Sequence, residues 1–210
     1  MKKAYLITDC HRSEFSQILQ KIDQNDLIIG IDGGANLLFQ HKIKPDLIIG
    51  DLDSIGTETL EYYKNKTKIE KFPAEKNETD SELALDWCHK NSISEIILVN
   101  SLDRRFDHSL GMISLLFSGR ERSQKIVIEN DRQQIFLAEK ETSLETRIGS
   151  VISLIPLSER VEAISTDGLE FGLKNDILYR NATRGISNIS TQKKIRISFD
   201  KGDLLIILNK

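Results

Sequence analysis

In residues 3–129, short apolar runs alternate with amphipathic segments, and this alternation limits the possible fold more than any other feature of the sequence. The apolar runs have the length of buried strands, and the segments between them have a helical period. Strands are predicted at 3–8, 27–32, 47–50, 68–72, 95–100 and 125–129, and helices at 12–21, 36–41, 58–66, 79–90 and 107–117. Strands that alternate with helices form right-handed βαβ units, so an α/β domain with a mainly parallel sheet is expected.

The alternation ends near Gln134. From there the sequence has β-branched runs separated by turn residues, at 151–157, 161–166, 169–173, 194–198 and 204–208. Short strands with regular turn signals are typical of an antiparallel sandwich or barrel. A chain of 210 residues is long enough for two small domains. We therefore expect an α/β domain at 1–133 and an all-β sandwich domain at 134–210.

Charge and composition argue against several classes of partner. The net charge of -3 and a pI near 5.9 do not give the basic character that favours binding to nucleic acid or an anionic membrane. Apolar runs fall short of the ~20 residues that span a bilayer, and Asp9 interrupts the opening run before any signal-peptide cleavage site. Cys10 and Cys88 have no metal-ligand spacing, so a reducing, cytoplasmic setting is expected, with Cys88 as a buried structural thiol.

Two carboxylates, Asp51 and Asp53, follow the apolar run 47–50 directly. Carboxylates at a strand tip can converge on one hard cation, and Mg²⁺ usually takes one or two of them and leaves its other positions to water and phosphate. The alternative is a surface turn in which Asp and Ser54 cap the backbone, a frequent origin of an isolated Asp-x-Asp. Ligands of α/β sheets bind beyond the carboxyl ends of the strands, where Asp32 and Asn100 are also predicted.

The segment 32–36, Asp-Gly-Gly-Ala-Asn, joins a predicted strand to a predicted helix. Glycines there allow close backbone approach, and a helix N-terminus offers N–H groups to phosphate. The spacing matches neither a Walker A loop nor a Rossmann fingerprint, so a tight strand-to-helix turn explains it equally well.

The segment 76–82 has the pattern of a helix entry. Thr79 and Glu82 match a capping box, and Asp80 in the first turn complements the helix dipole. Asp80 is also placed to act as a third carboxylate for a metal ion, and Lys76 as a phosphate clamp. Both readings remain open at this point.

The segment 100–108 joins the strand at 95–100 to the helix at 107–117. Arg104 and Arg105 would lie at the same sheet edge as the aspartates, where a guanidinium group can clamp phosphate. Asp107 fits an N-cap, and a lone His108 favours a structural or surface role. Carboxylates, a lysine and arginines on one edge suit metal-assisted phosphoryl chemistry, which depends mainly on positioning and charge neutralisation.

Taken in order, the motifs at 32–36, 50–54, 79–80, 105–108, 164–169, 185–188 and 202–207 resemble those of thiamine pyrophosphokinases. The resemblance covers nearly the whole chain. It implies an N-terminal α/β domain that binds nucleotide and metal, and a C-terminal β-sandwich that binds thiamine and forms a homodimer. It also implies transfer of the terminal pyrophosphoryl group of ATP to thiamine, giving thiamine diphosphate and AMP.

The resemblance also implies residue roles. Mg²⁺ would be held by Asp51, Asp53 and Asp80. The nucleotide site would comprise Asp32, Gly33, Gly34, Asn36, Lys76, Thr79 and Arg105. The residues implied to take part in catalysis are Asp51, Asp80, Arg105 and Asp107. Thiamine would contact Phe171, Ser187 and Asn188, and the loop that carries Ser187 and Asn188 would reach an active site across the dimer interface.

The chain departs from the family pattern at two places. Asp103 and Arg104 stand where the family commonly has Gly-Gly, and Phe171 stands where some relatives have Trp, a stronger face for a cationic thiazolium. Two other functions remain as alternatives. One is a haloacid-dehalogenase-type phosphohydrolase with Asp51 as nucleophile, and the other is a non-catalytic binding protein for thiamine or a nucleotide.

Overall fold

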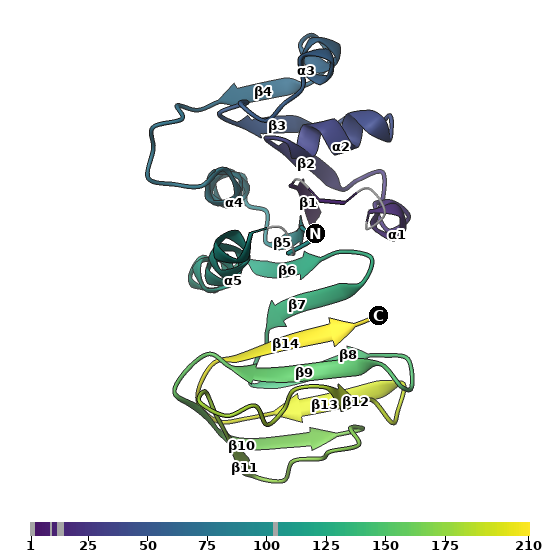
Figure 1. Ribbon diagram of the computed structural model, residues 1–210, viewed down its shortest axis with the longest axis vertical. Helices are drawn as coiled ribbons and strands as arrows, with labels where there is room; N and C mark the ends of the chain where they lie inside the picture. The colour runs from purple at the N-terminus through teal and green to yellow at the C-terminus, as the bar shows by residue number, and fades with distance from the viewer. Residues whose placement is uncertain (1–2, 9, 12–14, 103–104) are drawn as a thin grey trace. The chain divides into compact units, whose positions relative to one another are not determined.

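The computed structural model describes residues 3–8, 10–11, 15–102 and 105–210. The chain divides into two compact units, Met1–Asp131 and Arg132–Lys210, which are described separately below (Figure 1). In the described part of the chain, no helix has the length and apolar character needed to cross a membrane.

The first unit is built on a parallel sheet. Its strands are β1 (Lys3–Ile7), β2 (Leu27–Ile31), β3 (Leu47–Gly50), β4 (Lys68–Lys71), β5 (Glu95–Val99) and β6 (Lys125–Glu129). Their order is β6-β5-β1-β2-β3-β4, and each neighbouring pair is parallel. Parallel sheets are covered on both faces, which explains why the central strands are continuous apolar runs. β3, for example, is buried along its whole length.

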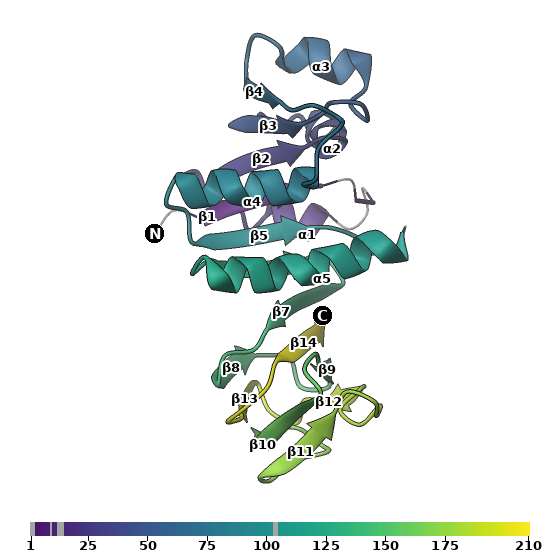
Figure 2. The ribbon, with the colours of Figure 1, turned by 90° about the vertical axis from the view of Figure 1, so that its left-hand side faces the viewer.

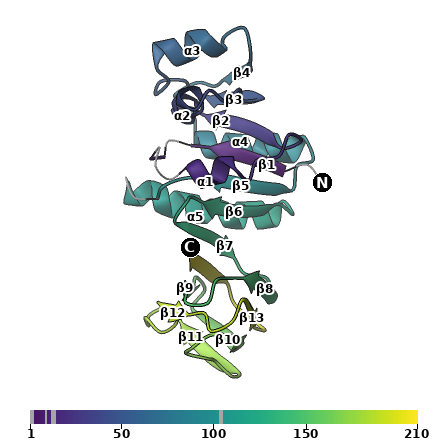
Figure 3. The ribbon, with the colours of Figure 1, turned by 90° about the vertical axis from the view of Figure 1, so that its right-hand side faces the viewer.

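Helices cover both faces of this sheet. Figure 2 shows α4 (Asp80–Lys90) and α5 (Phe106–Glu121) on one face. Figure 3 shows α1 (Ser16–Leu19) and α2 (Gly34–Gln40) on the other face, with α3 (Thr57–Tyr63) at the β4 end of the sheet. The predicted α/β domain with a mainly parallel sheet is confirmed.

The second unit consists of two antiparallel sheets. Its strands are β7 (Gln133–Leu137), β8 (Glu141–Glu145), β9 (Val151–Pro156), β10 (Arg160–Asp167), β11 (Asp176–Tyr179), β12 (Asn188–Ile189), β13 (Lys194–Ser198) and β14 (Leu204–Asn209). One sheet has the order β12-β9-β14-β7 and the other β11-β10-β13-β8. Side chains of both sheets share one core, including Leu154 and Ile206 from the first and Val161 and Ile195 from the second. The predicted β-sandwich is therefore confirmed.

Two predicted elements differ from the structure by more than a shift of their ends. The helix predicted at 12–21 is shorter, α1, and residues 12–14 lie outside the described part. The strand predicted at 169–173 is wrong, because Gly168, at a φ of 82°, ends β10, and within 169–173 Leu169 alone makes an isolated bridge, to Ser190. The apolar alternation there arises because Leu169 and Leu173 are buried in the core without belonging to a strand.

Candidate active site

Three aspartates converge beyond the carboxyl ends of two neighbouring strands. Asp32 follows β2 and Asp51 follows β3, and these strands pair in parallel. Asp80 is the first residue of α4, which packs on the same strands. One carboxylate oxygen from each aspartate lies within 4.8 Å of the others. The predicted edge position of Asp32 and Asp51 is confirmed.

Gly50 makes this approach possible. Its φ is 147°, which side chains of L residues rarely allow, and a Cβ there would lie 3.1 Å from Asp32 Cβ and 3.3 Å from Asp80 Cγ. Asp32 and Leu52 also have positive φ, 43° and 70°. Non-glycine residues in this region are strained, and such strain tends to be retained where it aims functional groups. The backbone here is thus shaped to bring the carboxylates together.

Lys76 lies among these carboxylates and is nearly buried, with 12% of its side chain exposed. Its Nζ forms ion pairs with Asp51 Oδ2, at 3.5 Å, and with the buried Asp80 Oδ1, at 3.1 Å. Burial alone would lower the pKa of Lys76, but the negative charges of Asp80 and Asp51 outweigh it and raise that pKa. The ammonium group therefore stays charged.

The electrostatic environments of Asp51 and Asp32 differ. The backbone N–H of Asp53 donates to Asp51 Oδ1 at 3.1 Å and, with the Lys76 ammonium, holds the pKa of Asp51 below its ordinary value. Burial raises the pKa of Asp32, although hydrogen bonds from Ser54 oppose this effect. The backbone N–H of Ser54 donates to Asp32 Oδ1 at 3.3 Å. The loop after β3 thus ties the two carboxylates together.

Asp53, which the family resemblance assigns to the metal ion, lies outside the carboxylate group found among the described residues. Its side chain is on the exposed side of the loop, where its Oδ1 accepts from Ser54 Oγ at 2.8 Å. Asp32 takes its place in the group. The metal role of Asp53 stays a prediction.

Two residues of the segment 32–36 have structural tasks. A Cβ on Gly34 would lie 1.9 Å from the Ile7 carbonyl oxygen, so glycine is required for α2 to begin against β1. Asn36 donates from Nδ2 to Ser54 O at 2.9 Å and accepts at Oδ1 from the Gly56 N–H at 2.9 Å. Asn36 thereby fixes the loop that carries Asp51. A direct contact of either residue with nucleotide stays a prediction.

Thr79 is the N-cap of α4, as predicted. Its side chain accepts a hydrogen bond from the Glu82 N–H at 3.2 Å. Asp80 and Glu82 place negative charge in the first turn, where it is stabilised by the helix dipole. The cap and the carboxylate group thus coexist at the start of α4.

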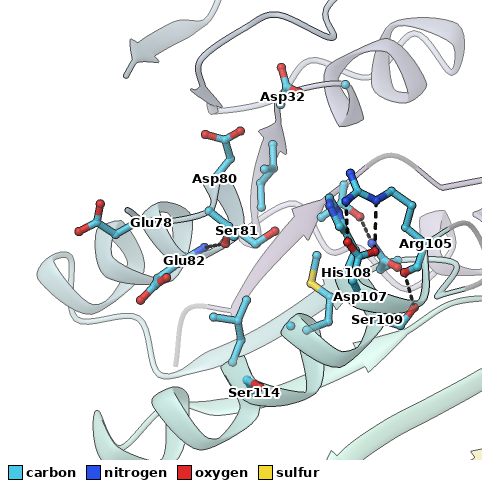
Figure 4. A pocket seen from close by; sticks show the side chains of 18 of the residues that line it. Asp32, Glu78, Asp80, Ser81, Glu82, Arg105, Asp107, His108, Ser109 and Ser114 are labelled. Carbon is cyan, nitrogen blue, oxygen red and sulfur yellow. Dashed lines mark hydrogen bonds and ion pairs between the residues drawn. The ribbon is translucent and has the colours of Figure 1, made fainter. Parts of the chain in front are cut away.

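Arg105 and Asp107 form an exposed pair at the start of α5 (Figure 4). Arg105 Nη2 is 2.5 Å from Asp107 Oδ2, and Nε donates to Oδ1 at 3.2 Å. The guanidinium group lowers the pKa of Asp107, and the carboxylate raises the pKa of Arg105. The predicted N-cap at Asp107 is wrong, because α5 begins at Phe106 with Arg105 in the cap position. His108 lies in the first helical turn, and Arg104 is outside the described residues.

A hydrogen-bond network behind this edge was not predicted from the sequence. Asn100 Nδ2 donates to Thr8 Oγ1 at 2.7 Å, and Asn100 Oδ1 accepts from the Leu102 N–H at 2.7 Å. Asn130 Nδ2 donates to the Asn100 carbonyl at 3.0 Å. These bonds hold the chain after β5 at the same edge as the aspartates. The strand-end position of Asn100 was the available signal, but Thr8 and Asn130, two of its partners, are distant in sequence.

Many of the side chains described above line one cavity of about 1060 Å³ in the first unit. Its lining includes Asp32, Asp51, Lys76, Asp80 and Arg105. Figure 4 shows Asp80 at the start of its helix and Arg105 with Asp107 at the start of another. The volume suits a nucleotide-sized ligand. Carboxylate oxygens within 4.8 Å of one another fit a hard divalent cation such as Mg²⁺, and the charged lysine fits phosphate.

The residues assigned to thiamine by resemblance belong to the second unit. Phe171 is 64% exposed, and Ser187 is exposed with a φ of 58°. Asn188 is instead 3% exposed.

Cys88, in α4 of the first unit, is fully buried, as predicted, and burial raises the pKa of its thiol to about 12.

Comparison with known proteins identifies the family. Residues 18–128 match the model of the thiamin pyrophosphokinase catalytic domain, and residues 135–204 match the model of the thiamin pyrophosphokinase vitamin B1 binding domain. A thiamine pyrophosphokinase from Bacillus subtilis (strain 168) is 31% identical over 188 residues, which are 88% of this chain and 88% of the relative. Thiamine pyrophosphokinase 1 from Oryza sativa subsp. japonica is 30% identical over 205 residues, 85% of this chain and 77% of the relative.

The fold agrees with this result. A crystal structure of thiamine pyrophosphokinase from Bacillus subtilis superposes with a TM-score of 0.89 and 26% identity over the superposed residues, covering 100% of this chain and 99% of that one. Family models, relatives and fold lead to one conclusion. This chain belongs to the thiamine pyrophosphokinase family.

Proposed function

We propose that this chain transfers the terminal pyrophosphoryl group of ATP to the hydroxyethyl group of thiamine, giving thiamine diphosphate and AMP, in the cavity of the first unit. The observation that carries the proposal is the convergence of Asp32, Asp51 and Asp80 beside Lys76. Phosphoryl transfer needs positioning and neutralisation of negative charge more than covalent participation by the protein. This group of side chains provides both.

In this proposal Asp51 and Asp80 hold Mg²⁺, with Asp32 as their neighbour. Their converging oxygens support this role, and no similar observation supports Asp53. Bound Mg²⁺ would supply Lewis-acid polarisation and charge neutralisation at the phosphates. Two protein carboxylates would leave the other positions of the ion to phosphate and water, as Mg²⁺ prefers.

The protein's cations and Asp107 have distinct tasks. The Lys76 ammonium neutralises phosphate charge, and the Arg105 guanidinium is available at the cavity for phosphate oxygens. Asp107 holds that guanidinium in place, and its lowered pKa makes it a weak base. The thiamine hydroxyl therefore attacks the β-phosphorus in line, aided by positioning and charge neutralisation rather than by a strong general base.

In this proposal the second unit binds thiamine. The active form of the protein is a homodimer. Phe171 presents an aromatic face to the cationic thiazolium, and Ser187 offers an exposed hydroxyl. Large exposed apolar side chains on this unit, Phe171, Tyr179 and Ile186, support a protein contact surface. Sedimentation equilibrium tests the dimer, and a monomer at all concentrations would rule it out.

The decisive experiment measures AMP and thiamine diphosphate formed from ATP and thiamine, with and without EDTA. We expect stoichiometric products that EDTA abolishes. Asp51→Ala should remove turnover while the protein stays folded. Glu61→Ala, which removes a carboxylate that is 65% exposed on α3, is the control and should retain turnover.

The alternatives predict other outcomes. A phosphorylated Asp51 trapped from ATP would indicate a phosphohydrolase. Thiamine binding without ATP turnover would indicate a binding protein. Near-normal AMP release by folded Asp51→Ala protein would refute the metal role of Asp51.

A further inference from the structure

Residues 168–171 run antiparallel beside residues 188–191 in the second unit. The Thr191 N–H donates to Gly168 O at 2.8 Å, and the Glu170 N–H donates to Ile189 O at 2.9 Å. Leu169 and Ser190 form an isolated bridge between them. This short ladder brings the chain up to Phe171, where backbone pairing between the two segments stops and a side chain replaces it.

That side chain is Asn188. Its Oδ1 accepts from the Phe171 N–H at 3.0 Å, and its Nδ2 donates to the Phe171 carbonyl at 2.8 Å. Oδ1 also accepts from the Ile189 N–H at 2.9 Å, so both acceptor positions of this oxygen are used. The amide group thus takes the place of a backbone partner for Phe171.

Asn188 is much less exposed to solvent than its neighbours in the loop. Asn188 is 3% exposed, whereas Phe171 is 64% exposed and Ser187 lies on the surface. A buried amide whose oxygen has no remaining lone pair is poorly placed to bind a ligand directly. The exposed ring that it holds is well placed.

We propose that Asn188 is a positioning residue, which acts on thiamine binding by fixing the backbone of Phe171. The inference rests on the proposed function, in which the Phe171 ring meets the thiazolium. Phe171 lies outside any strand, so the Asn188 amide is what holds both of its backbone polar groups. Fixing the backbone orients the ring before the ligand arrives, which reduces the ordering cost of binding.

A double-mutant cycle tests this inference. Phe171→Ala should raise the KM for thiamine about 3- to 30-fold, the range expected for loss of a cation–π contact. Asn188→Asp, which keeps the acceptor but removes the donor to the Phe171 carbonyl, should raise it in the same direction with little change in kcat or in the KM for ATP. In the Phe171→Ala background, Asn188→Asp should have no further effect. Asn209→Ala, which removes another side-chain amide bonded to backbone in this unit, is the control and should leave the KM unchanged.

A second measurement does not depend on activity. Hydrogen exchange of the Phe171 amide, measured by NMR without thiamine, should be accelerated in Asn188→Ala or Asn188→Asp while the core amides of β13 stay protected. Unchanged exchange at Phe171 overturns the inference. Full additivity of the two substitutions in the cycle also overturns it, because Asn188 then contacts thiamine independently. If Phe171→Ala leaves the KM unchanged, the proposed thiamine contact itself is wrong, whatever the exchange data show.

Discussion

Replacing Gly50 by alanine would perturb the carboxylate group without removing any charge. The new Cβ would meet Asp32 Cβ at 3.1 Å and Asp80 Cγ at 3.3 Å. Both contacts are shorter than the usual separation of about 3.5–4.0 Å between carbon atoms. Asp32 and Asp80 must therefore move away from residue 50 by roughly a few tenths of an ångström, which changes the spacing of the carboxylate group.

The size of the effect follows from two contributions. A non-glycine residue at a φ of 147° is expected to cost roughly 1–3 kcal/mol of unfolding free energy. For a chain of this length, that lowers Tm by about 2–12 °C, so the variant should remain folded. A misplacement of about 1 Å can cost on the order of 100-fold in rate, so kcat should fall about tenfold. The Mg²⁺ concentration for half-maximal activity should rise, because Mg²⁺ requires near-ideal geometry.

Gly149→Ala is the matched control. Gly149 has a φ of 88°, and a Cβ there would meet no atom within 4 Å. This variant should show a similar loss of thermal stability with wild-type turnover. The assay is AMP release against Mg²⁺ concentration, with Tm measured by calorimetry. A folded Gly50→Ala protein with wild-type kcat and Mg²⁺ dependence would refute the argument that the absent side chain sets the spacing of the carboxylates.

Three further outcomes are expected. Thr79→Ala should cost about 1 kcal/mol in denaturant unfolding through loss of the cap, with unchanged Mg²⁺ dependence, whereas Asp80→Asn should raise the Mg²⁺ requirement about tenfold or more. The reverse pattern would show that Asp80 is only a helix-end residue. Gly34→Ala should lose ~3 kcal/mol or more, or fail to fold, because its Cβ would lie 1.9 Å from a backbone oxygen; a wild-type melting curve would contradict this. Cys88, whose buried thiol has a pKa of about 12, should react with a thiol reagent at pH 8 only after unfolding, so rapid labelling of the native protein would be the opposing result.

The local features of the site could be predicted because each depends on residues close in sequence. Thr79 and Glu82, three residues apart, mark the start of α4, and the cap is present. The run 47–50 that ends in glycine marks a buried strand, and Asp51 follows its tip. Strand alternation predicted the shared edge because parallel strands deliver their carboxyl ends to the same side.

Other features depend on contacts between distant segments, which the sequence pattern does not contain. Asp32 joins Asp51 and Asp80 because β2 and β3 are neighbours and Gly50 leaves space between them. The apolar alternation at 169–173 suggested a strand, but backbone pairing with 189–191 ends at Glu170, and the side chain of Asn188 bonds to the backbone of Phe171. In both cases the sequence pattern does not say which distant segment lies beside the one in question.

Lys76 gives the anionic cluster a resident positive charge. Three carboxylates with oxygens within 4.8 Å of one another repel by several kcal/mol at a half-buried site, and an ammonium 3.1 Å and 3.5 Å from two of them offsets part of that repulsion. The chain therefore carries its own counter-ion, which lowers the cost of bringing the carboxylates together before a divalent ion binds. The carboxylate group is therefore expected to stay assembled in magnesium-free protein.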